Sequence, residues 1–111
     1  MVSYKVEISP TARDQLNRYV NYIQFTLLNE EAADAVLLDA YETIDDLEAS
    51  AGSLRFCNDP DLEALGYRKI MFRRHDYVMI YDIEGSTARI KGIYHLLQDY
   101  ENLFSSQILQ T

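Results

Sequence analysis

Cysteine, positive charge and long apolar runs are all scarce in this chain of 111 residues. The one cysteine, Cys57, excludes an internal disulfide and fits a reducing cytoplasm, where a free thiol usually behaves as a small apolar residue. No apolar run approaches the length of a membrane span, and the first residues lack the apolar core of a signal peptide. We therefore expect a soluble cytoplasmic protein with no membrane partner.

Motifs for metals and phosphates are also missing from the sequence. His75 and His95 are not spaced with each other or with Cys57 as metal ligands are, and no glycine-rich loop is present to cradle a phosphate. We therefore expect neither a metal site nor a cofactor.

Cations are outnumbered, and the imbalance is uneven along the chain. Ten Lys/Arg face eighteen Asp/Glu, which gives a net charge of −8. Residues 1–66 hold four cations and thirteen acids, whereas residues 67–111 hold six and five. Most nucleic-acid binders are basic, because phosphate contacts supply much of their affinity. The acidic balance therefore argues against a nucleic-acid partner, and only the second half carries a local basic cluster.

Periodicity predicts a strand and then a helix at the start of the chain. Apolar and charged residues alternate over residues 2–8, as they do in a strand. Ser9 can cap a helix, and Pro10 stands where its missing N–H group costs nothing. Apolar residues at helical spacing then predict one amphipathic helix over about 10–28.

A second amphipathic helix is predicted to follow, with Asn29 as its cap. Glu30 and Glu31 lie in its first turn, where the helix dipole favours negative charge. The short join makes the two helices an antiparallel hairpin. Its predicted apolar face consists of Ala33, Val36, Leu37, Ala40, Ile44 and Leu47. Its predicted solvated face consists of Asp39, Glu42, Asp45, Asp46 and Glu48.

The remainder is predicted to be a loop, three strands and a short helix. Turn-forming residues gather over 50–66, where Leu62 and Leu65 are expected to anchor the loop to the core. Gly85 allows a tight turn, and a final amphipathic helix is expected over about 98–109. The predicted strands cover residues 67–72, 77–83 and 87–95.

These elements predict one domain over residues 1–111 with an α+β fold. The order is strand, helix, helix, strand, strand, strand and short helix, with no internal repeat or linker. A helical hairpin packed on one face of a mostly antiparallel four-stranded sheet satisfies that order.

Four cations near the middle of the chain form the clearest candidate site. Arg68, Lys69, Arg73 and Arg74 have no acid among them. They could grip phosphate or the carboxylates of a partner, because arginine forks suit both. They could equally be outward-facing charges that discourage pairing at a sheet edge. Arg68 is the strongest single candidate, because it is placed on a strand rather than a turn.

His95, at the end of the last predicted strand, is the second candidate. A histidine titrates near neutral pH and can act as a general acid, but a hydrogen-bonded residue at a strand end is the commoner role. The neighbouring Tyr77, Tyr81 and Tyr94 are expected to lie in the core or on a sheet face rather than to stack on bases.

Three segments carry a resemblance to a known family: YKVEISPTARDQLNRYVNYI at the start, GYRKIMF in the middle and IYHLLQDYENLF at the end. In their order and spacing they resemble the RelE/ParE superfamily, the toxins of bacterial type II toxin–antitoxin systems. The resemblance implies the α+β fold predicted above. It also implies a cognate antitoxin as partner, in a toxin–antitoxin hetero-oligomer, and leaves a homodimer open.

The superfamily has two branches with different activities. RelE-like members cut messenger RNA on the ribosome without a metal, whereas ParE-like members are known as inhibitors of DNA gyrase. The RelE-like alternative implies that Arg68 and Lys69 bind phosphate and that His95 is the acid. However, Tyr77-Val78-Met79 and His95-Leu96-Leu97 stand where ribonuclease members commonly carry arginine.

The ParE-like branch is favoured, because His95, Gln98, Asp99 and Tyr100 resemble its ending. A toxin of a plasmid-stabilisation module is then implied, which binds a target such as gyrase without chemistry of its own. Its expected contact residues are Arg68, Arg73, Arg74 and Tyr100. A third alternative is a degenerate, non-toxic binding protein with the same fold. Charge complementarity predicts a neutral or basic toxin-binding segment in the antitoxin.

Overall fold

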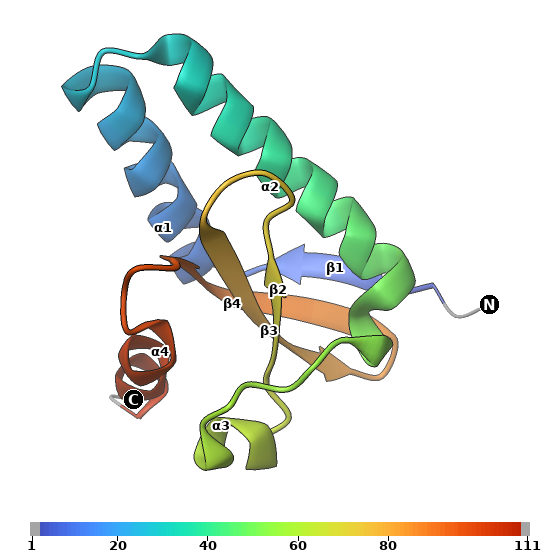
Figure 1. Cartoon of the computed structure of the whole chain (residues 1–111). Helices are drawn as coiled ribbons and strands as arrows, with labels where there is room; N and C mark the ends of the chain where they lie inside the picture. The colour runs from blue at the N-terminus through green and yellow to red at the C-terminus, as the bar shows by residue number, and fades with distance from the viewer. Residues whose placement is uncertain (1–2, 110–111) are drawn as a thin grey trace.

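The computed structural model describes residues 3–109, and it confirms the predicted α+β fold (Figure 1). Val2, at the start of the first predicted strand, lies outside the described residues. The strands are β1 (Lys5–Ile8), β2 (Arg68–Met71), β3 (Tyr77–Glu84) and β4 (Thr87–His95). The helical elements are α1 (Pro10–Asn21), the π-helix η1 (Tyr22–Thr26), α2 (Glu30–Ser50), the 3₁₀-helix η2 (Ala51–Ser53), α3 (Pro60–Ala64) and α4 (Tyr100–Ile108).

The four strands form one sheet in the order β1-β4-β3-β2. β1 runs parallel to β4, and the other neighbouring strands are antiparallel. The turn between β3 and β4 contains Gly85, whose φ of 62° lies in the left-handed region that glycine favours. Because the first strand pairs with the last, the helical half of the chain is tied directly to the C-terminal strands.

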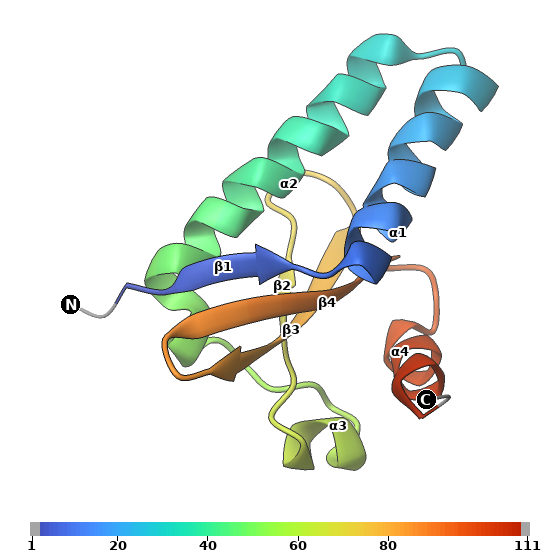
Figure 2. The same cartoon turned by 180° about the vertical axis from the view of Figure 1, so that it is seen from behind.

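α1 and α2 form the predicted antiparallel hairpin (Figure 2). The hydroxyl of Ser9 accepts a backbone N–H of the first turn of α1 at 3.1 Å, and the side chain of Asn29 does the same for α2 at 3.0 Å. The tip of the hairpin differs from the prediction. The α-helical pattern stops at Asn21, η1 follows, and Leu28 reverses the chain with a φ of 54°. A non-glycine residue in this region is uncommon and marks local strain.

The hairpin covers one face of the sheet, and α4 with the segment before β2 covers the other (Figures 1 and 2). The central strand β3 is therefore apolar on both sides. The hairpin-side core includes Leu16, Val36, Leu47, Tyr81 and Ile90. The opposite core includes Cys57, Leu62, Val78, Ile80 and Phe104.

The segment between α2 and β2 is less irregular than its sequence suggests. It contains η2 and α3, and the carboxylate of Asp59 caps α3. Leu62 is fully buried, as predicted, but the prediction for Leu65 is wrong because that side chain is 61% exposed. Cys57 is buried, and this burial raises the pKa of its thiol to about 12. The thiol is therefore protonated at neutral pH, as the apolar role predicts.

Gly92 on β4 lets α4 approach the sheet closely. A Cβ atom at this position would lie 2.7 Å from the ring of Tyr94 and 3.0 Å from the ring of Phe104. Phe104 is the fully buried anchor of α4. The glycine therefore fixes how α4 docks on its face of the sheet.

Candidate functional site

A buried carboxylate from α2 holds the loop between β2 and β3. Asp39 is 1% exposed and accepts the backbone N–H groups of Arg73, Arg74 and His75 at 3.1, 2.9 and 2.9 Å. It also accepts a hydrogen bond from Nδ1 of His75 at 2.7 Å. Burial alone would raise the pKa of Asp39, but the hydrogen bonds from His75 and from the loop N–H groups lower it. The carboxylate is thus ionised, and the prediction that Asp39 lies on the solvated face is wrong.

Arg73 and Arg74 are paired with acids of α2. The guanidinium of Arg73 donates to both oxygens of Asp46, at 2.9 and 2.6 Å, and to Glu42 at 2.9 Å. Arg74 donates to the other oxygen of Glu42 at 2.7 Å. The predicted basic cluster, which contains no acid in the sequence, is therefore paired with two acidic residues in the folded protein. The pairs are partly exposed, since the side chains of Arg73 and Arg74 are 43% and 60% accessible, and such pairs are weak enough to be exchanged for a partner's acids.

Lys69 is buried rather than presented to solvent. It is 5% exposed, and its ammonium lies 2.8 Å from a carboxylate oxygen of Glu101 and 3.1 Å from the hydroxyl of Tyr100. Burial by itself would lower the pKa of Lys69, but the hydrogen bonds to Glu101 and Tyr100 raise it, so the group is charged. Lys69 and Tyr100 are brought together, but as a contact between β2 and α4.

Arg68 faces the other side of β2, because successive side chains of a strand alternate. Its guanidinium stacks 4.0 Å from the ring centroid of Phe56 and donates to the carbonyl of Leu54. The four cations predicted as one cluster are therefore divided between two faces and a loop. Of the four cations, only Arg73 and Arg74 present their charged groups to the same region of solvent.

His95 ends β4, as predicted, and lies far from Arg68. In the sheet, His95 of β4 lies opposite Tyr77 of β3. Arg68 of β2 lies opposite Tyr81, on the other edge of β3. Four residues of strand separate these positions by about 13 Å along the sheet, and two strand spacings add about 9 Å across it. The imidazole of His95 accepts the N–H of Leu97 through Nδ1 at 3.1 Å.

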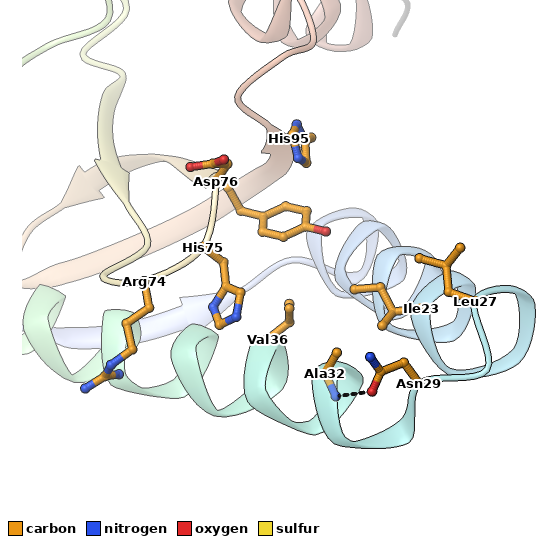
Figure 3. Close-up of a pocket in the computed structure, with 10 residues that line it drawn as sticks. Ile23, Leu27, Asn29, Ala32, Val36, Arg74, His75, Asp76 and His95 are labelled. Atoms are coloured by element: carbon orange, nitrogen blue, oxygen red, sulfur yellow. Dashed lines mark hydrogen bonds between the residues drawn. The ribbon is translucent and has the colours of Figure 1, made fainter.

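The structure instead brings the two histidines to one cleft, between the tip of the hairpin and the start of β3 (Figure 3). The cleft holds about 430 Å³. His75 and His95 contribute polar atoms, while Ile23, Leu27 and Val36 supply apolar walls. The predicted tyrosines are core residues: Tyr77 and Tyr81 lie in the hairpin-side core and Tyr94 in the opposite core.

The roles of Asp39 and His75 and the pairing of Glu101 with Lys69 were not predicted from the sequence. A signal was present for Asp39, which stands three residues after Val36 and four before the buried Thr43, on the apolar stripe of its helix. A carboxylate at a core position needs several donors, which pointed to a nearby loop. No comparable signal marked Glu101, because it follows Lys69 by 32 residues.

Among residues 3–109, no group of three or more His, Cys, Asp or Glu side chains is placed to hold a metal ion. Within the same part of the chain, every helix is too short or too polar to cross a membrane.

The family model for the ParE toxin of the type II toxin–antitoxin system parDE matches residues 6–100. The solved structure of a chromosomal ParDE system from P. aeruginosa superimposes with a TM-score of 0.71 at 18% identity, over 85% of this chain and 97% of that one. The isolated E. coli RelE toxin, P21 form, gives a TM-score of 0.45 at 12% identity, over 96% of this chain and 99% of that one. No curated protein sequence matches significantly. The match over residues 6–100 spans nearly the whole of the chain, which therefore belongs to the ParE toxin family of type II toxin–antitoxin systems.

Proposed function

We propose that this ParE-family protein inhibits growth by binding a protein target such as DNA gyrase, without cleaving RNA, and that a cognate antitoxin neutralises it. One observation supports the proposal: the groups that an RNA-cleaving site needs lie far apart in the structure. In-line attack by a 2′-hydroxyl requires an acceptor, a donor and cations around one phosphate.

The three residues of the nuclease alternative do not meet that requirement. Lys69 is 5% exposed and already hydrogen-bonded to Glu101 and Tyr100. Arg68 is engaged by Phe56 and lies about 16 Å from His95 by strand geometry. A single phosphate cannot be reached by all of them. Binding without chemistry is the function that this geometry supports best.

The contact surface for the target is proposed around Arg73 and Arg74. They are the most exposed of the four predicted contact residues, and their partners Glu42 and Asp46 lie on the solvated side of α2. An acidic patch on the target would replace Glu42 and Asp46 as the partner of these guanidinium groups with little loss of free energy, since exposed ion pairs contribute little to stability. Arg68 and Tyr100 contribute less, because both are half-buried and hydrogen-bonded within the protein.

The first prediction concerns activity in two assays. Purified protein is expected to inhibit supercoiling by gyrase and to leave messenger RNA on ribosomes intact. Replacing both Arg73 and Arg74 with Ala is expected to weaken the inhibition about tenfold or more, because charge-assisted hydrogen bonds are lost. Arg13→Ala, a change at an exposed arginine of α1, serves as the control.

Cleavage of the message that depends on His95 and Arg68 would establish the nuclease alternative instead. Inactivity in both assays, with harmless expression, would favour the degenerate binding protein.

The antitoxin is proposed to lay a neutral or basic segment on the helical hairpin. Exposed acids line α2, and large apolar side chains stand exposed at the tip of the hairpin, among them Phe25 at 67% and Leu28 at 83%. An amphipathic basic segment would satisfy both features. Its affinity should fall as the salt concentration rises, which titrations between 50 mM and 500 mM NaCl would measure. Salt-independent binding would contradict the electrostatic part of the proposal.

A further inference from the structure

The cleft between η1, the start of α2 and the loop before β3 has features of a small-ligand site. Its volume of about 430 Å³ falls in the usual range for such sites. In Figure 3, Ile23 and Leu27 face Val36 across the cleft, while Arg74 and Asp76 extend away from these apolar side chains. The apolar part of the cleft would therefore accept the hydrocarbon body of a ligand.

The hydroxyl of Tyr77 is the polar group that the protein leaves unused. Tyr77 is 9% exposed, and its ring is fixed by Tyr19, Phe72 and His95 at centroid distances of 5.0, 5.4 and 5.0 Å. Within residues 3–109, nothing is hydrogen-bonded to this hydroxyl. No fully buried side-chain oxygen or nitrogen of the described chain lacks a partner, so this hydroxyl keeps some exposed surface, and Tyr77 lines the cleft.

The hydroxyl of Tyr77 and the ring of His95 offer hydrogen-bond donors to the cleft. Burial, and then the charge of Asp76, raise the pKa of Tyr77, so its hydroxyl retains the proton. Because Nδ1 of His95 accepts the N–H of Leu97, the neutral ring of His95 carries its proton on Nε2. The Nδ1–H group of His75 donates to Asp39, so Nε2 of its neutral ring is an acceptor, and Asp76 also lines the cleft. The hydrogen-bond donors that a ligand meets here are therefore the hydroxyl of Tyr77 and Nε2 of His95.

We propose that this cleft binds a compact organic acid, with its apolar body between η1 and α2 and its carboxylate on the hydroxyl of Tyr77 and Nε2 of His95. A carboxylate accepts hydrogen bonds at both oxygens, which matches two adjacent donors. The strained reversal at Leu28 and the π-helical turn of η1 hold Ile23 and Leu27 against α2 and so form the apolar wall. This site adjoins the proposed target contact, because Arg74 lines the cleft and Arg73 does not.

Three matched probes test the chemistry: 3-phenylpropionate, 3-phenylpropanol and 3-phenylpropylamine. They share one apolar body and differ only in the head group. In NMR titrations of the full chain, 3-phenylpropionate is expected to shift the ring signals of His75 and His95 and to bind about tenfold tighter than the alcohol. The amine is expected to bind more weakly still. Equal affinity of all three probes, or no shift with any of them, would overturn the proposal.

Two variants locate the ligand within the cleft. Tyr77→Phe removes only the hydroxyl and is expected to weaken binding of 3-phenylpropionate about tenfold while leaving the alcohol less affected. Ala32→Leu is expected to fill the apolar part and to abolish binding of both. Tyr41→Phe, on a tyrosine that is 55% exposed and outside the cleft, is the control. Amide spectra establish that each variant is folded, and unchanged affinity in Tyr77→Phe would refute the assigned position.

The carboxylate has two plausible sources, which share this chemistry: a free small acid or the C-terminus of a polypeptide. A tetrapeptide that ends in Phe with a free carboxylate, and the same peptide with a C-terminal amide, separate them. Competition with 3-phenylpropionate by the free peptide alone assigns a protein C-terminus. Failure of both peptides, while 3-phenylpropionate binds, assigns a free acid.

Discussion

Replacing Glu101 with Gln is expected to lower the free energy of unfolding by about 3–5 kcal/mol, because it leaves the buried charge of Lys69 without a counter-ion. The two groups are 2.8 Å apart, and their side chains are only 15% and 4% accessible. Glu101 also accepts the backbone N–H groups of Asn58 and Asp59 at 3.1 and 2.7 Å. One carboxylate therefore joins α4, β2 and the loop before α3. Equilibrium unfolding in urea is the measurement.

A control and a double variant make this result interpretable. Glu63→Gln removes an exposed carboxylate of α3, and we expect it to change stability by less than about 0.5 kcal/mol. Combining Glu101→Gln with Lys69→Met removes both charges, and it should recover much of the loss, since a buried pair can be replaced by apolar groups at little cost. A single variant as stable as the wild type would show that the pair does not hold α4.

Replacing Asp39 with Asn is expected to cost about 2–4 kcal/mol and to free the loop between β2 and β3. The carboxylate accepts four hydrogen bonds, three of them from the backbone of Arg73, Arg74 and His75. An amide has one oxygen, so at least one of these donors loses its acceptor and the others lose the charge of theirs, and hydrogen bonds to a charged group contribute about 1.5–3 kcal/mol each. Faster hydrogen exchange at these three amides, beyond the change in global stability, is the local readout.

The pH dependence of this variant has a definite sign. The ordinary pKa of an aspartate is 3.8, and that of Asp39 is lower in the folded protein. As the pH falls, the unfolded chain therefore binds a proton at this carboxylate before the folded protein does. The stabilisation by Asp39 is complete above the ordinary pKa, and it is lost as the pH falls through the lower pKa of the folded protein. The difference in stability between the wild type and Asp39→Asn should narrow below pH 4. Asp45→Asn, an exposed position of the same helix, should show no such trend.

Much of the fold could be predicted because its signals are local. The strand and helix periodicities, the caps at Ser9 and Asn29, and the turn at Gly85 depend on residues a few positions apart, and the structure contains all of them. The family resemblance pointed the same way. The exception at the hairpin tip is instructive, because the apolar spacing of residues 22–28 suits a π-helical turn as well as an α-helical one.

The candidate site was harder to predict because its pairs are distant in sequence. A run of cations without acids suggested a free basic surface, yet Arg73 meets Asp46 across 27 residues. Lys69 was predicted either to bind phosphate or a partner's acids or to be an outward-facing charge at a sheet edge, and neither alternative anticipated its burial. Its position on the inner face of β2 follows only when α4 supplies Glu101. The cleft likewise exists only after η1 and the loop before β3 have been brought together.

The edges of the sheet limit how a partner can engage this toxin. Outside β2, Phe56 forms a bridge with Arg68, and the backbone N–H groups of Cys57 and Lys69 bond to the carbonyls of Tyr67 and Arg55. The segment around Phe56 thus covers the Arg68 end of this edge, and an incoming chain would first have to displace it there. Within residues 3–109, no strand pairs with the outer side of β1, over Lys5–Ile8, which leaves this edge for strand addition. A polypeptide that extends the sheet at this edge would align beside the N-terminal strand, next to the hairpin.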